Sequence, residues 1–156
     1  MESSGDSPDD QTFERLTGGC MCGAVKFELD APLFGAAFCW CKRCQRRTGT
    51  AFSTTALTRP GSFNITEGAE LIGTHEPGDG GWNKSFCTRC GSQIHTTNAD
   101  DPDLVAVRMG AFDEDPGVRP GLHQFVSYAP SWYAVPDDGL PRFPERLDWN
   151  QVDAGS

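Results

Sequence analysis

Gly19-Cys20-Met21-Cys22-Gly23-Ala24-Val25 is a short segment in which glycine stands on both sides of a cysteine pair. Glycine lets the backbone bend sharply, so both sulfurs can point at one metal ion. A second pair, Cys87-Thr88-Arg89-Cys90-Gly91, has the two-residue spacing of a zinc knuckle. Together the two pairs offer four thiolates, the number that closes a tetrahedral zinc site.

The remaining three cysteines lie within Cys39-Trp40-Cys41-Lys42-Arg43-Cys44. Three sulfurs hold an ion on three sides and leave the fourth position to water or substrate, as in catalytic zinc sites. A closed site is the main alternative, with a carboxylate, His75, His95 or His123 as fourth ligand. A further alternative is a zinc ribbon that combines the CxxC pair with part of this segment. A cysteine–histidine nucleophile pair is disfavoured, because a zinc-bound thiolate is a poor independent nucleophile.

The N-terminal sequence and the absence of a long apolar stretch lead us to expect a protein of a reducing compartment. The chain begins MESSGDSPDDQ, without a signal peptide, and no stretch is apolar enough to span a membrane, so we expect a cytoplasmic protein. Seven cysteines is an odd number, and cytoplasmic disulfides are rare, so a disulfide framework is disfavoured. The formal net charge of −9 and the pI near 4.6 disfavour nucleic acids and anionic membranes as partners.

Short alternating runs predict a mainly β fold. Val25, Phe27 and Leu29 alternate with polar residues, the period of a strand with one buried face. Similar runs occupy residues 51–57, 62–66, 69–75, 92–97, 103–109 and 123–128, and turn-forming Pro and Gly separate several of them. No window sustains a helical period, so few or no helices are expected beyond one turn after Cys44.

Four segments together resemble the glutathione-dependent formaldehyde-activating enzyme (GFA) family. They are residues 19–25, 39–46 (Cys39-Trp40-Cys41-Lys42-Arg43-Cys44-Gln45-Arg46), 49–52 and 86–92. His123 and residues 129–133 and 140–143 look like the family's terminal strand and tail. The resemblance spans about residues 16–144 and includes all seven cysteines. It implies stacked antiparallel β-sheets, the β-tent fold, carrying zinc knuckles.

The resemblance also implies two zinc ions per chain. Cys20, Cys22, Cys87 and Cys90 would hold a structural zinc, and Cys39, Cys41 and Cys44 a catalytic one. The implied activity is that of a carbon-sulfur lyase, which joins a glutathione-like thiol and a formaldehyde-like aldehyde reversibly into an S-hydroxymethyl adduct. The alternative is a non-catalytic zinc module that binds a protein partner. Met21 and Trp40 depart from the family, whose members often carry histidine between the paired cysteines, and Trp40 is expected to change the wall beside the open zinc.

The expected organisation is a disordered acidic tail (1–14), one zinc-binding domain (15–147) and a short C-terminal tail (148–156).

Within the domain, residues 31–66 hold no acidic residue but five cations, Lys42, Arg43, Arg46, Arg47 and Arg59. Some of these charges are expected to compensate the thiolates. Arg46 and Arg47 are the candidates for binding a carboxylate of the thiol substrate. The aromatic residues near the C-terminus are expected to cover the core.

Overall fold

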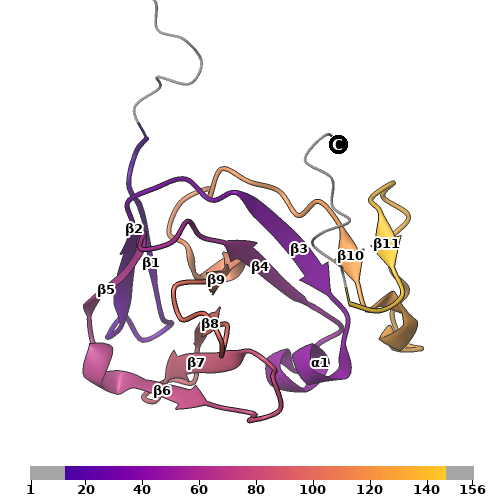
Figure 1. Ribbon diagram of the computed structural model, residues 1–156, viewed down its shortest axis with the longest axis horizontal. Coiled ribbons are helices and arrows are strands. Elements are labelled where there is room, and N and C mark those ends of the chain that lie inside the picture. The colour runs from indigo at the N-terminus through magenta and orange to yellow at the C-terminus, as the bar shows by residue number, and fades with distance from the viewer. Residues whose placement is uncertain (1–12, 147–156) are drawn as a thin grey trace, which may run out of the picture.

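A computed structural model describes residues 13–146 and confirms a mainly β architecture (Figure 1). Its eleven strands form two sheets, one of three strands in the order β1-β2-β5 and one of eight in the order β11-β10-β3-β4-β9-β8-β7-β6. The strands are β1 (Leu16–Gly19), β2 (Lys26–Leu29), β3 (Gly35–Cys39), β4 (Ser53–Leu57), β5 (Phe63–Glu67), β6 (Ile72–His75), β7 (Asn83–Cys87), β8 (Gln93–Thr97), β9 (Val105–Arg108), β10 (His123–Gln124) and β11 (Arg142–Phe143). The only α-helix among the described residues is α1 (Lys42–Thr48).

Pairing is antiparallel except at one edge of the large sheet. There β10 lies between β3 and β11 and runs parallel to both. The expectation of antiparallel sheets therefore holds for the rest of the described strands but not for this edge. Phe125, directly after β10, has a φ of 59°, a left-handed conformation that ends the strand, and a 3-10 turn follows at Val126–Tyr128.

The hydrophobic core lies where the two sheets face each other. Leu16, Phe27 and Leu29 project from the small sheet, and Ala56, Ile94 and Val107 from the large one, into a single buried cluster. Burial of each large side chain stabilises the packing by roughly 1.5 to 3 kcal/mol. The alternation of residues 25–29 thus produces the buried face that it predicted.

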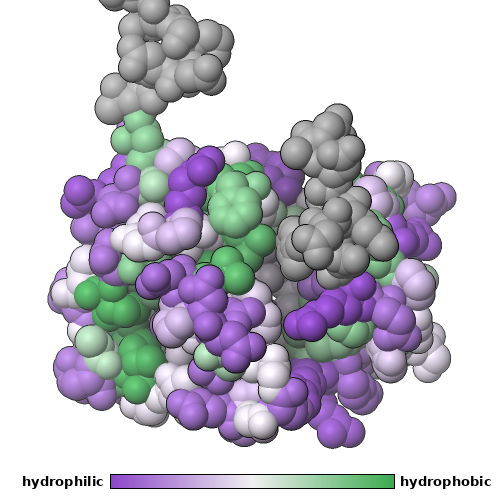
Figure 2. Space-filling model, in the orientation of Figure 1, coloured by the Kyte–Doolittle hydropathy of each residue, from purple (hydrophilic) through white to green (hydrophobic). Residues whose placement is uncertain are grey.

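Hydrophobic residues on the surface shown in Figure 2 form separate patches among hydrophilic residues. No helix between residues 13 and 146 has the length and apolar character needed to cross a membrane. The predicted terminal tails fall almost entirely outside the described residues. Phe13, which is described, is partly buried and packs against the core.

Candidate metal centres

The four-cysteine cluster joins the two sheets. Cys20 and Cys22 follow β1 in the small sheet, Cys87 ends β7 in the large sheet, and Cys90 follows in the turn to β8. Their four sulfurs lie within 4.8 Å of one another. Sγ of Cys22 lies 3.5 Å from Sγ of Cys20 and 4.0 Å from Sγ of Cys87. These separations bracket the sulfur–sulfur edge of about 3.8 Å that follows from Zn–S bonds of about 2.3 Å in a tetrahedron, so the residues present fit a zinc ion.

Two tight turns aim these sulfurs inward. Gly23 and Gly91, directly after Cys22 and Cys90, have φ values of 80° and 81°, which only glycine adopts without strain. The backbone N–H of Val25 donates to Sγ of Cys20 at 3.2 Å. Hydrogen bonding from the side chain and backbone of Ser92 lowers the pKa of Cys90 to about 5, so its metal-binding thiolate form is favoured.

The three-cysteine cluster forms where β3 passes into α1. Cys39 ends β3, Cys41 is the N-cap of α1, and Cys44 lies in the first helical turn, where its backbone N–H donates to Sγ of Cys41 at 3.3 Å. Their sulfurs also lie within 4.8 Å of one another. Hydrogen bonding among the three thiols lowers the pKa of Cys44 and raises the pKa of Cys39. Three crowded sulfurs therefore cannot all ionise without a cation, and a bound metal ion would supply one.

No histidine or carboxylate among residues 13–146 joins either cluster. His75 is exposed, and His95 is buried on β8 with its ring 4.7 Å from that of Phe63. His123 has both ring nitrogens engaged, as described below. The proposed closure of the three-cysteine cluster by a histidine therefore has no support in this arrangement.

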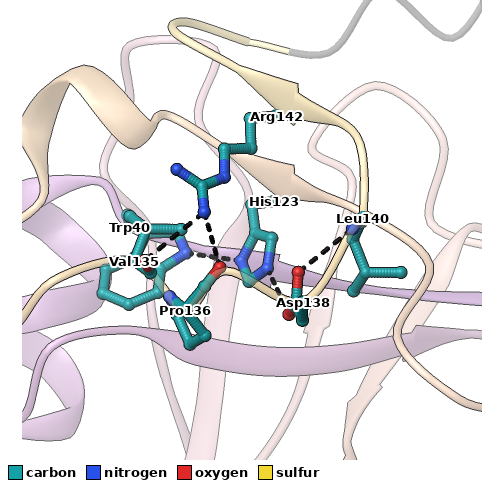
Figure 3. Close-up of polar contacts among 7 residues, drawn as sticks. All are labelled: Trp40, His123, Val135, Pro136, Asp138, Leu140 and Arg142. Atoms are coloured by element: carbon teal, nitrogen blue, oxygen red, sulfur yellow. Dashed lines mark hydrogen bonds and ion pairs between the residues drawn. The ribbon is translucent and has the colours of Figure 1, made fainter.

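Trp40, between two of the cysteines, is fully buried and is hydrogen-bonded to the C-terminal segment (Figure 3). Its indole N–H donates to Nδ1 of His123 at 3.0 Å, and Nε2 of His123 lies 2.9 Å from Oδ2 of Asp138. Because an indole N–H can only donate, Nδ1 of His123 is unprotonated and Nε2 carries the proton that Asp138 accepts. This contact with His123 lowers the pKa of Asp138. The chain of hydrogen bonds fixes the backbone from which Cys39 and Cys41 project.

A pocket of about 600 Å³ lies beside α1, between the helix and strands β6 to β8. Its lining includes the predicted Arg46 and Arg47, together with Arg43, His75, Lys84 and Gln93. Arg46 is exposed, whereas Arg47 is half-buried and donates from Nη2 to the carbonyl of Ser85 at 3.0 Å. Two adjacent arginines of one helix thus have different surroundings.

Two further cations near Cys44 were missed by the sequence interpretation. Arg108, the last residue of β9, is buried with 8% exposure, and Lys84 of β7 is half-buried. Burial lowers the pKa of both side chains, while the nearby charge of Cys44 acts in the opposite direction. A signal was present at Arg108, because a cation within the apolar run 104–109 is rarely buried without a functional partner.

These features describe a two-sheet β protein with two cysteine clusters that can each hold a metal ion. The profile of the glutathione-dependent formaldehyde-activating enzyme family matches residues 15–128, and the chain belongs to this family.

Two similar proteins extend the comparison over most of the chain. A Halomonas elongata protein, provisionally named a glutathione-dependent formaldehyde-activating enzyme, is 27% identical over 154 residues, covering 85% of this chain and 96% of its own. The crystal structure of a Rhodobacter sphaeroides protein superposes with a TM-score of 0.55 at 25% identity, covering 81% of this chain and 98% of that one.

Proposed function

We propose that this protein is a zinc-dependent carbon-sulfur lyase that joins a glutathione-like thiol and a formaldehyde-like aldehyde reversibly. Cys39, Cys41 and Cys44 would hold the catalytic zinc, and Cys20, Cys22, Cys87 and Cys90 a structural zinc. The observation that carries the proposal is a three-thiol cluster that no fourth side chain of the described residues completes, at the start of the helix whose arginines line a cation-rich pocket. A site that only stabilises the fold has no need of an open ligand position.

The reaction is an addition and needs no oxidant. The thiol gives up its proton, its sulfur attacks the carbonyl carbon, a C–S bond forms as the C=O π bond breaks, and the carbonyl oxygen takes a proton to give the S-hydroxymethyl adduct. The reverse reaction breaks the C–S bond and releases the aldehyde and the thiol. A zinc ion at the three cysteines supplies Lewis acidity that keeps a substrate thiol ionised near neutral pH.

The protein's own side chains would position the thiol. Arg47 is half-buried and faces the pocket, so it is better placed than exposed Arg46 to bind a buried carboxylate. Arg46 would act at the pocket rim, where solvent and salt weaken its attraction. Trp40 contacts His123, Phe52 and Tyr133 and would act by fixing the ligand segment.

Cobalt substitution tests the proposal directly. Co²⁺ in a sulfur site absorbs visible light, and its spectrum changes when a fourth ligand changes from oxygen to sulfur. We expect glutathione to shift that spectrum in the wild-type protein but not in Cys41→Ser, and the wild type to accelerate adduct formation from glutathione and formaldehyde, measured by NMR exchange. If no thiol changes the spectrum of folded, metallated protein, the enzyme proposal fails and a non-catalytic interaction module replaces it.

A further inference from the structure

Three cations lie near Cys44 without an acidic partner. Arg47 comes from α1, Lys84 from β7 and Arg108 from β9, so the three come from separate elements. Each lies near enough to Cys44 for the charges to influence each other. None of the three forms an ion pair with a carboxylate of residues 13–146, although Arg43, on the same helix as Arg47, pairs with Asp79.

The charges do not balance without a further anion. Three thiolates and one Zn²⁺ leave a net charge of −1 at Cys39, Cys41 and Cys44 (−3 + 2). The three cations add +3, so the site carries a surplus of +2, and of +1 once a substrate thiolate is bound. Compensation of the thiolates therefore accounts for one cation of the three. Buried charges without partners are costly, so the surplus points to a ligand that is itself anionic.

Unpaired polar atoms lie in the same region. Two buried donors, Nη1 of Arg47 and Nε of Arg108, have no hydrogen-bond partner among the described residues. Arg47, Lys84 and Gln93 line the pocket of about 600 Å³, and Gln93 and Arg108 line an adjoining hollow of about 550 Å³. Unsatisfied buried donors are rare in folded proteins, and guanidinium donors match the oxygens of a carboxylate.

We propose that Arg47, Lys84 and Arg108 form a carboxylate-binding subsite where the pocket and the adjoining hollow meet at Gln93, near Cys44 and distinct from exposed Arg46. The inference rests on the proposed function, since it concerns a ligand held next to the same metal site. The carboxylate can come from the thiol or from the aldehyde. A subsite so close to Cys44 makes an aldehyde that carries a carboxylate a substrate class for this protein.

The first experiment compares two thiols that differ in a carboxylate. Cobalt-substituted protein is titrated with 3-mercaptopropionate and with 2-mercaptoethanol, and the spectral change gives each dissociation constant. We expect the wild type to prefer the carboxylated thiol by about 10- to 100-fold if the thiol supplies the carboxylate. Lys84→Met should remove most of that preference. Lys42→Met is the matched control, because Lys42 is an exposed cation of α1 that does not line the pocket, and it should retain the preference.

The second experiment tests whether the aldehyde supplies the carboxylate. With mercaptoethanol as the thiol, NMR exchange gives the rate of adduct formation with glyoxylate and with formaldehyde. A preference for glyoxylate that Lys84→Met abolishes and Lys42→Met retains assigns the carboxylate to the aldehyde. Arg47→Gln is a second test variant, since glutamine keeps a donor for the Ser85 carbonyl while losing the charge.

Two results would overturn the subsite. One is a wild type that favours neither carboxylated compound. The other is an equal loss of the preference in Lys42→Met and Lys84→Met. Equal losses would indicate a general electrostatic attraction by the cations of this surface and no specific subsite. In both cases mercaptoethanol would still change the cobalt spectrum, so the proposed lyase function would survive. Loss of every thiol response would instead remove both proposals.

Discussion

His123 connects the segment that carries Cys39 and Cys41 to the C-terminal part of the chain, and its replacement tests that connection. In His123→Phe the aromatic ring can still stack on Phe38, but the buried N–H of Trp40 loses its acceptor. An unsatisfied buried donor costs about 1 to 3 kcal/mol. We therefore expect lower thermal stability and faster loss of metal from Cys39, Cys41 and Cys44 to a chelator.

Asp138→Asn is the control for this substitution. Its amide oxygen can still accept the Nε2 proton of His123, so metal retention should stay close to wild type, although the Leu140 N–H loses the Oδ1 acceptor of Asp138 and stability falls slightly. Equal metal loss from His123→Phe and wild type would contradict the positioning role of this hydrogen-bond chain.

His95 makes stability depend on pH in mildly acidic solution. Burial, and secondarily the charge of Arg47, lower the pKa of His95 to about 4, against about 6.5 in an unfolded chain. The unfolded state therefore binds the proton more readily, and the stabilisation present above pH 6.5 is lost as pH falls toward 4. Between pH 7 and pH 5 we expect a loss of about 2 kcal/mol from this residue.

Acid also releases metal, so the contribution of His95 is obtained from the difference in unfolding free energy between the wild type and His95→Gln. His95→Gln cannot titrate, so the gap in unfolding free energy between wild type and variant should change by that amount across the pH range in denaturant melts. A gap that is constant with pH would show that His95 is not titrating as its burial predicts.

At this scale the sequence predicted the cysteine clusters better than their surroundings. The family resemblance grouped all seven cysteines into the two clusters that the structure brings together. Spacing identified the pairs, because a CxC or CxxC turn is a local property of the chain. It could not separate Arg46 from Arg47, which differ only in the direction each faces on α1. Lys84 and Arg108 could not be associated with Cys44, because strand pairing across the large sheet brings them there.

Among the structural elements, the turns that carry the four-cysteine cluster should matter most for folding. They connect β1 of one sheet to β7 and β8 of the other, so losing the cluster separates the two sheets at that end. Cys20→Ser or Cys90→Ser should cost several kcal/mol or abolish soluble expression. Cys41→Ser should give a folded protein that lacks one metal ion. Thermal melts with metal analysis rank the variants, and the reverse order would mean that the structural and catalytic roles are exchanged.

Strands with alternating or β-branched residues were predicted, and strands made of small or polar residues were not. β2, β4, β6, β8 and β9 lie within predicted runs, and β5 ends one residue beyond its run, at Glu67. β3 reads Gly-Ala-Ala-Phe-Cys and β7 reads Asn-Lys-Ser-Phe-Cys, and neither shows a period of two. Their strand conformation comes from neighbours on both sides in the large sheet. The run 123–128 was too long, since Phe125 ends β10 after two residues. α1 begins at Lys42, before the predicted turn after Cys44.

For the whole molecule, the difference between a four-thiol and a three-thiol site predicts unequal metal lability. We expect up to two zinc ions per purified chain, one that resists mild chelation and one that leaves readily. Elemental analysis before and after chelator treatment measures both. Two ions of equal lability, or the colour of an iron centre, would contradict the assignment.

The parallel pairing of β10 with β3 also affects how the chain folds while it is being synthesised. Every ligand of the four-cysteine cluster precedes residue 91, whereas β3 gains its second neighbour only from His123–Gln124. The nascent chain can therefore bind its first metal ion while one edge of β3, which ends in Cys39, is still unpaired. Adding the intervening residues takes about 2 to 7 s at 5 to 20 residues per second. During that interval the unpaired edge of β3 is open to mispairing with other nascent chains.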